Sequence, residues 1–268
     1  MFAVSIRSKR SSPHEPRAFT VPEMLAVVAI MAIMLAILLP SFSKARYHAR
    51  HIKELSAAKQ VGIGFIRYSV ERLGRIIPGY AQEPARDTSG NAVNWPVSGR
   101  YPWRLAQYMD HHLEGGILVN EQEYLLKDPA ANAYAISLSP TLGMNMYHVG
   151  GDLISGLPKF WIEKRHEAHS PSRMITFASA RSNIGIVSHG FFRIEAPSFS
   201  FNNPAGWLPQ FKESDSAHLF GFVHPRWDGR AVVSHMDAHA DSLNTTELRD
   251  MTRWSNDAAK AGSPNWKP

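Results

Sequence analysis

The sequence contains no cysteine, which excludes disulfide bonds and thiolate metal sites. Charge is missing from one long stretch, because every residue from Met24 to Leu39 is apolar. Acidic residues are missing from residues 44–53, where four basic side chains follow one another closely. With 268 residues and 44% hydrophobic content, the remaining chain is long enough to form one ordinary core. The uncharged stretch therefore has to be explained separately from that core.

The net charge of +6 would suit a nucleic-acid partner if the basic residues formed one face. They do not, because the excess is confined to residues 1–18 and residues 44–53, on either side of the uncharged stretch. Residues 54–268 carry equal numbers of basic and acidic side chains. This distribution is typical of the flanks of a membrane span. We therefore expect membrane lipid as a partner and no nucleic acid.

The apolar stretch from Met24 to Leu39 allows three interpretations: a secretory signal, a buried helix of a soluble domain, and a membrane anchor. As a helix it spans about 24 Å, somewhat less than the hydrocarbon core of about 30 Å. A secretory signal ends in a small-residue cleavage site, whereas this run continues through Pro40 into a charged amphipathic segment. A soluble helix is rarely apolar on every face. These comparisons favour the membrane anchor.

Glu23 lies directly before the apolar run. A carboxylate deep in lipid is costly, so such residues usually have a partner and a role. Alternatively, the residue lies at headgroup level, where the helix dipole favours an anion. Electrostatics alone leaves both interpretations open.

The order of residues around Glu23 resembles the cleavage and methylation signal of type IV pilin-like and type II secretion pseudopilin-like proteins. The matching residues are Arg17-Ala18-Phe19-Thr20-Val21-Pro22-Glu23 followed by the long apolar run. The resemblance implies that prepilin peptidase removes a leader, residues 1–18, by cutting between Ala18 and Phe19. It also implies N-methylation of Phe19, and pairing of Glu23 with the N-terminal amine of a neighbouring subunit. The family usually has Gly in place of Ala18 and a large aliphatic residue in place of Pro22.

After the apolar run, hydrophobic and small residues recur at intervals of three and four, which predicts that the helix continues to residue 73. The positions of this face are Ile52, Leu55, Ala58, Gly62, Phe65, Ser69 and Leu73. Further short motifs resemble a pseudopilin-like subfamily: Lys59-Gln60-Val61-Gly62, Tyr68, Gly74-Arg75, Pro78 and Gly143-Met144-Asn145. We therefore expect a transmembrane or filament-core helix at residues 19–40, its amphipathic continuation at residues 41–78, and a periplasmic domain at residues 79–268.

The periplasmic domain is expected to be α+β, with an antiparallel sheet packed on the long helix. Residues 92–140 are rich in Pro, Gly and Asn, which predicts loops apart from a short helix near residues 102–111. β-Branched and aromatic content predicts the strands Met174–Ser179, Ile184–Ser188, Leu219–Val223, Ala231–His235 and His239–Leu243.

The best indication of chemistry is a group of His and Asp residues near the C-terminus. His224, Asp237 and His239 would suit a metal if two strands brought them together, and calcium is the ion that some pseudopilins bind. However, their spacing fits no tight metal motif, and alternating polar residues along a strand usually form an exposed face. This segment also resembles a subfamily hairpin in which Asp-Gly-His stands where this chain has Asp237-Ala238-His239. A structural hairpin is therefore favoured over a metal site or catalysis, and we expect neither a cofactor nor an enzyme.

Together these observations predict a structural subunit, a prepilin or pseudopilin, in a type IV pilus-like or type II secretion-like assembly. The resemblance implies a single-pass inner-membrane protein with a cytoplasmic N-terminus. Its implied partners are prepilin peptidase, other pilin or pseudopilin subunits, and an inner-membrane assembly platform. The alternative is a membrane-tethered periplasmic binding domain or metal-dependent enzyme that uses the helix only as an anchor.

Overall fold

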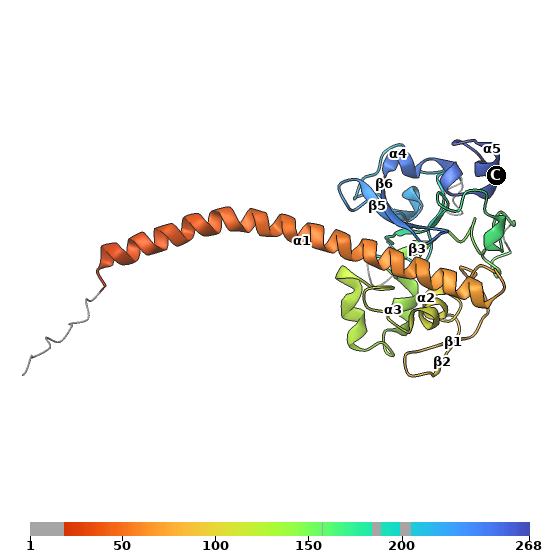
Figure 1. Ribbon diagram of the computed structural model, residues 1–268, viewed down its shortest axis with the longest axis horizontal. Helices are drawn as coiled ribbons and strands as arrows, with labels where there is room; N and C mark the ends of the chain where they lie inside the picture. Colours follow the sequence, from red (N-terminus) through yellow and green to blue (C-terminus); the bar gives the residue numbers. More distant parts are fainter. Residues whose placement is uncertain (1–18, 157, 184–188, 199–204) are drawn as a thin grey trace, which may run out of the picture. The chain divides into compact units, whose positions relative to one another are not determined.

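The computed structural model describes residues 19–156, 158–183, 189–198 and 205–268. The chain divides into two compact units, Met1–Tyr47 and His48–Pro268. Helix α1, Val21–Glu71, is continuous and contributes to both (Figure 1). Within Met1–Tyr47 the described residues are its N-terminal part, including Pro40 and the apolar run. The predicted leader, with Ala18, lies outside the described residues.

In the second unit, residues 48–71 of α1 form one wall of the core. One face of this segment is buried, with Ala57, Ala58, Val61 and Phe65 fully inaccessible to solvent. The predicted helix is confirmed, but the predicted face is wrong at both ends. Ile52 is 64% exposed and Leu73 is 92% exposed, because the buried face begins at Glu54 and the helix ends at Glu71.

The sheet beside α1 has four antiparallel strands in the order β3-β4-β5-β6: Leu142–Met144, Ile175–Ser179, Arg230–His235 and Ala240–Asn244 (Figure 1). All residues of β4 and all but the first of β5 are buried. Phe65 of α1 meets Phe177 of β4 edge-to-face, with ring centroids 6.0 Å apart. The expected α+β class, a long helix packed on an antiparallel sheet, is confirmed.

Smaller elements complete the second unit. They are β1 (Ala85–Arg86) paired with β2 (Ala92–Val93), helices α2 (Tyr101–Ala106), α3 (Ala133–Leu138), α4 (Thr245–Leu248) and α5 (Asn256–Ala261), and the 3-10 turns η1 (Gln107–Met109), η2 (Asn120–Lys127), η3 (Arg165–Glu167), η4 (Ala217–Phe220) and η5 (Met251–Arg253). Residues 92–140 therefore contain more regular structure than predicted, although α2 confirms the expected short helix.

Three predicted strands are confirmed as β4, β5 and β6, and no boundary is shifted by more than one residue. The strand predicted over residues 219–223 is wrong. The chain there forms η4, and Gly221 and Phe222 both have φ near +59°, which a strand does not allow. The apolar residues that suggested a strand, Phe220 and Phe222, are buried in the core from this turn. The strand predicted over residues 184–188 lies outside the described residues.

Candidate functional site

The first turn of α1 holds the carboxylate of Glu23 back over the start of the helix. The backbone N–H and the hydroxyl of Thr20 both donate hydrogen bonds of 2.8 Å to Glu23 Oε2. This arrangement satisfies an N–H group that the helix geometry leaves unpaired. The Glu23 carboxylate therefore lies beside Thr20, the residue that follows Phe19. Phe19 is 69% exposed.

The apolar run that follows Glu23 is exposed along its whole length. Residues 24–39 are all exposed, and α1 is long and apolar enough to span a membrane. The hydroxyls that come next do not interrupt this surface, because Ser41 and Ser43 donate to the carbonyls of Ile37 and Leu39 within the helix. The run thus presents an almost purely apolar surface on every side.

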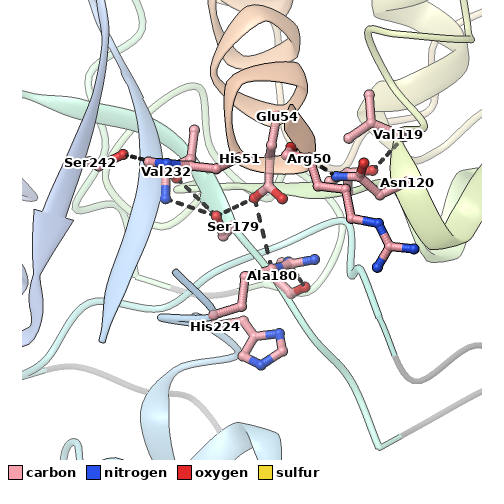
Figure 2. A network of polar contacts seen from close by, with 12 residues as sticks. Arg50, His51, Glu54, Val119, Asn120, Ser179, Ala180, His224, Val232 and Ser242 are labelled. Carbon is pink, nitrogen blue, oxygen red and sulfur yellow. Dashed lines mark hydrogen bonds and ion pairs between the residues drawn. The ribbon is translucent and has the colours of Figure 1, made fainter. Parts of the chain in front are cut away.

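In the second unit, the buried carboxylate of Glu54 joins α1 to the sheet (Figure 2). Glu54 is fully inaccessible to solvent, and Ser179 Oγ of β4 donates a hydrogen bond to its Oε1. Arg226 Nε lies 3.8 Å from the same oxygen, and the Arg226 guanidinium also donates to the carbonyl of Ala180. Ser179 Oγ in turn accepts a hydrogen bond of 2.9 Å from the N–H of Val232 in β5. A single carboxylate therefore links the helix to two adjacent strands.

One turn earlier, α1 is tied to two further segments of the domain. The ring of His51 lies 2.8 Å from Ser242 Oγ of β6 and stacks on Trp227, and partial burial lowers the pKa of His51. Asn120 donates a hydrogen bond of 3.2 Å to the carbonyl of Arg50 (Figure 2). The side chain of Arg50 pairs with Glu121 at 3.0 Å. The helix is thus held from the sheet on one side and from η2 on another.

Sequence reasoning did not identify Glu54 as a site residue. The predicted buried face contains Ile52 and Leu55 and passes over Glu54. A signal was present: Glu54 lies three or four residues before Ala57 and Ala58, and seven before Val61, on the face that is actually buried. An acidic residue at helical spacing from a run of small and apolar residues is a candidate for a buried, paired charge.

His224 is buried against Glu213 and takes no part in the C-terminal hairpin. Its Nε2 lies 2.9 Å from Glu213 Oε2, and its ring lies 5.8 Å from that of His189. Burial, together with the positive charge of Arg226, lowers the pKa of His224 to about 3. The side chain is therefore neutral at physiological pH.

The other two metal candidates pair with each other in the turn between β5 and β6. His239 Nδ1 lies 2.6 Å from Asp237 Oδ1, which also accepts a hydrogen bond from the His239 N–H. The His239 ring stacks on His235 with centroids 4.0 Å apart. Asp237 and His239 thus bond locally, in agreement with the hairpin interpretation. They do not form the exposed face of a strand, because both lie in the turn between β5 and β6. Among the residues that the structure describes, no group of three His, Asp or Glu side chains is arranged to hold a metal.

The turn places Ala238 in a left-handed backbone conformation. The N–H of Ala238 donates to the carbonyl of His235, the N–H of His235 donates to the carbonyl of His239, and Ala238 has φ +68°. This is the left-handed conformation that glycine adopts without strain. The alanine is buried, and its methyl group lies against α1 at Gly62.

Comparison of the chain with protein-family models, with curated proteins and with solved structures gave no match at the significance required. The architecture, a long apolar N-terminal helix continuing into an antiparallel α+β domain, is compatible with a pilin-like protein.

Proposed function

We propose that this chain is a structural subunit of a type IV pilus-like or type II secretion-like assembly. The observation that carries the proposal is the division of α1 into two segments of opposite character. Residues 24–39 are exposed and apolar on every face, whereas residues 54–69 are buried against the domain by one face and by the Glu54 network. The first segment needs lipid or other subunits to cover it. The second segment attaches the folded domain firmly to the same helix.

Covering the apolar run with lipid keeps the subunit in the membrane before assembly. Each square ångström of apolar surface removed from water contributes about 25 cal/mol, and bilayer lipid offers a similar environment before assembly. The filament then exchanges lipid contacts for contacts between helices. Close packing and charge pairing in the assembled core determine which arrangement forms.

Glu23 supplies the charge pairing. In the proposed pathway, prepilin peptidase cuts between Ala18 and Phe19, and the new amine of Phe19 is methylated. The Glu23 carboxylate of one subunit pairs with the amine of a neighbour once both enter the apolar core. Thr20 holds the carboxylate over the start of the helix meanwhile, through two hydrogen bonds. The subunit waits in the inner membrane, with the N-terminus cytoplasmic and the second unit periplasmic, until the assembly platform adds it to a pilus or pseudopilus.

Mass spectrometry of the N-terminus of the protein purified from its native membrane tests the processing step. The proposal requires a chain that begins with N-methyl-Phe19. A mature chain that retains Met1, or begins at another residue, would show that the helix serves only as a tether for a periplasmic binding domain or enzyme.

The variant Glu23→Gln tests the assembly step. The carboxamide keeps the size of the side chain but removes the charge, so an amine in the apolar core loses its partner. We expect at least about a tenfold loss of sheared filaments or of crosslinked subunits, with membrane association unchanged. Glu71→Gln, at the exposed opposite end of α1, is the matched control and should assemble normally. Equal assembly by both variants would refute the charge-pairing step.

A further inference from the structure

A pocket of about 350 Å³ opens to solvent beside the β1–β2 hairpin, away from the residues that attach α1 to the sheet. Its walls come from four separate segments: the hairpin, the turn at residues 94–97, Trp103 of α2, and residues 128–133. This volume lies at the lower end of the range for small-molecule sites.

One wall of the pocket is an indole held firmly in place. Trp95 is 45% exposed, although large aromatic side chains are usually well covered. Its ring lies 5.3 Å from that of Tyr80, and it approaches the backbone at Gly99 so closely that a Cβ there would lie 2.4 Å from the indole. The turn is closed by hydrogen bonds from Ser98 N–H to Asn94 and from Gly99 N–H to Pro96. The indole is therefore positioned before any ligand arrives.

The rest of the pocket offers both hydrogen-bond donors and hydrogen-bond acceptors. Hydroxyls of Thr88 and Ser89, the amide of Asn94, and the carboxylate of Asp128 all line it. The N–H of Ala131 donates a hydrogen bond of 3.0 Å to Asp128 Oδ1, which fixes the orientation of that carboxylate.

The charge of the pocket restricts its ligand. None of the described residues that line it is basic, and two, Asp87 and Asp128, are acidic. Phosphates, carboxylates and nucleotides would meet repulsion with no compensating cation. Asp87 is already engaged, because it accepts hydrogen bonds from the N–H groups of Ser89 and Asn91. The groups left for a ligand are thus an aromatic face, hydroxyls, an amide and one carboxylate.

We infer that this pocket binds a neutral carbohydrate, the end of a glycan chain. A pyranose ring has an apolar C–H face that packs on an indole, and its hydroxyl groups both donate and accept hydrogen bonds at its rim. Trp95 supplies the packing surface, Asp128 and Asn94 accept from the sugar hydroxyls, and Thr88 and Ser89 complete the rim. The pocket contains none of the residues assigned to assembly. A subunit can therefore bind a glycan whether it is anchored in the membrane or part of a filament.

The full chain, held in polyoxyethylene detergent that carries neither sugar nor charge, can be titrated with maltotriose, cellotriose and chitotriose. Saturation-transfer NMR detects which sugar protons contact the protein, and titration to about 10 mM detects a Kd of about 1 mM. We expect at least one trisaccharide to bind, and Trp95→Ala to weaken it at least about tenfold. Asp128→Ala, on a separate segment of the lining, should also weaken binding. This second variant keeps the test decisive if Trp95→Ala fails to fold.

The matched control is Tyr124→Ala, which removes an exposed aromatic ring, 48% accessible, that does not line the pocket. It should bind as the wild type does. Gly99→Ala should also weaken binding, because the added methyl displaces the indole. Three results would overturn the inference: no trisaccharide binding by the wild type, binding that survives both Trp95→Ala and Asp128→Ala, or binding of tetramethylammonium at Trp95 without binding of any sugar. The last result would identify a site for organic cations.

Discussion

The close approach of α1 to the β5–β6 turn predicts different effects for alanine substitutions at two glycines of the same helix. A Cβ added at Gly62 would lie 2.6 Å from Ser234 Oγ and 2.9 Å from both the Cα and the Cβ of Ala238. The Ala238 backbone belongs to a hydrogen-bonded turn, so it cannot move away without breaking the turn. A Cβ added at Gly64 would lie 2.6 Å from Met109 Cγ, the middle of a flexible side chain.

The magnitudes follow from two opposing terms. Replacing a glycine by alanine inside a helix stabilises it by about 1 kcal/mol. Overpacking a well-filled core costs about 1–3 kcal/mol, and the upper end applies where backbone must shift. We therefore expect Gly62→Ala to lower the free energy of unfolding by about 2 kcal/mol, and Gly64→Ala to leave it within about 1 kcal/mol of wild type. At about 2–4 °C per kcal/mol, the two variants should differ in Tm by several degrees.

The assay is thermal unfolding of the detergent-solubilised full chain, with wild type, both single variants and a double variant. Ser234→Ala removes the atom nearest to the added methyl, and Ser234 Oγ has no hydrogen-bond partner among the described residues, so this change alone should cost little. Gly62→Ala combined with Ser234→Ala should recover about 1 kcal/mol, as a positive coupling energy. Equal Tm values for the two glycine variants, or strictly additive effects in the double variant, would refute the packing argument.

Three further predictions concern the domain. Glu54→Ala should lower the free energy of unfolding by about 3 kcal/mol, because Arg226 keeps a largely buried charge without its carboxylate; urea titration measures this, and a change below about 1 kcal/mol would contradict it. Burial lowers the pKa of His148 and of His235 to about 4. Between pH 6.5 and about 4, these two histidines are therefore protonated in the unfolded chain but neutral in the folded chain. As the pH is lowered through this window, the free energy of unfolding should decrease by up to about 1.4 kcal/mol per pH unit for each of the two histidines. His235→Gln should therefore make Tm less dependent on pH, and an unchanged slope of Tm against pH would contradict this prediction. Ala238→Gly should raise the free energy of unfolding by about 0.5 kcal/mol. Glycine removes the strain of the left-handed conformation at φ +68°, about 1–2 kcal/mol, and loses one buried methyl group, worth about 0.8 kcal/mol. A lower Tm for this variant would show that the methyl contact outweighs the strain.

The long helix and the central strands were predictable because their signals are local. An uncharged run of apolar residues and a three-to-four spacing extend over many turns of α1, and β4 and β5 each contain two β-branched residues. The region at residues 92–140 was not predictable, because short helices such as α3 depend on contacts with distant segments. Trp103 of α2, for example, donates a hydrogen bond to the carbonyl of Ala133.

Some short motifs owe their residues to packing that no local signal shows. Gly143 in β3 is one case, since a Cβ there would lie 2.8 Å from the backbone of Arg193. Asn145 is another, because its buried amide donates to the carbonyls of Ile175 and Trp254, which lie far apart in sequence. The sequence indicated that these positions mattered through resemblance, but only the folded chain gives the physical reason.

Glu54 also shows why a buried charge can be retained in a helix that apolar residues would hold equally well. Replacing a buried ion pair by well-packed apolar side chains is often neutral or stabilising, so stability alone does not explain the carboxylate. An apolar helix face can slide or rotate on a sheet at little cost, whereas Glu54 meets Ser179 and Arg226 in one register only. Because α1 is a continuous helix from Val21 to Glu71, a pull on its apolar segment is transmitted along the backbone to residues 48–71. The polar contacts of Arg50, His51 and Glu54 come first in that path, and they resist sliding where an apolar face alone would not.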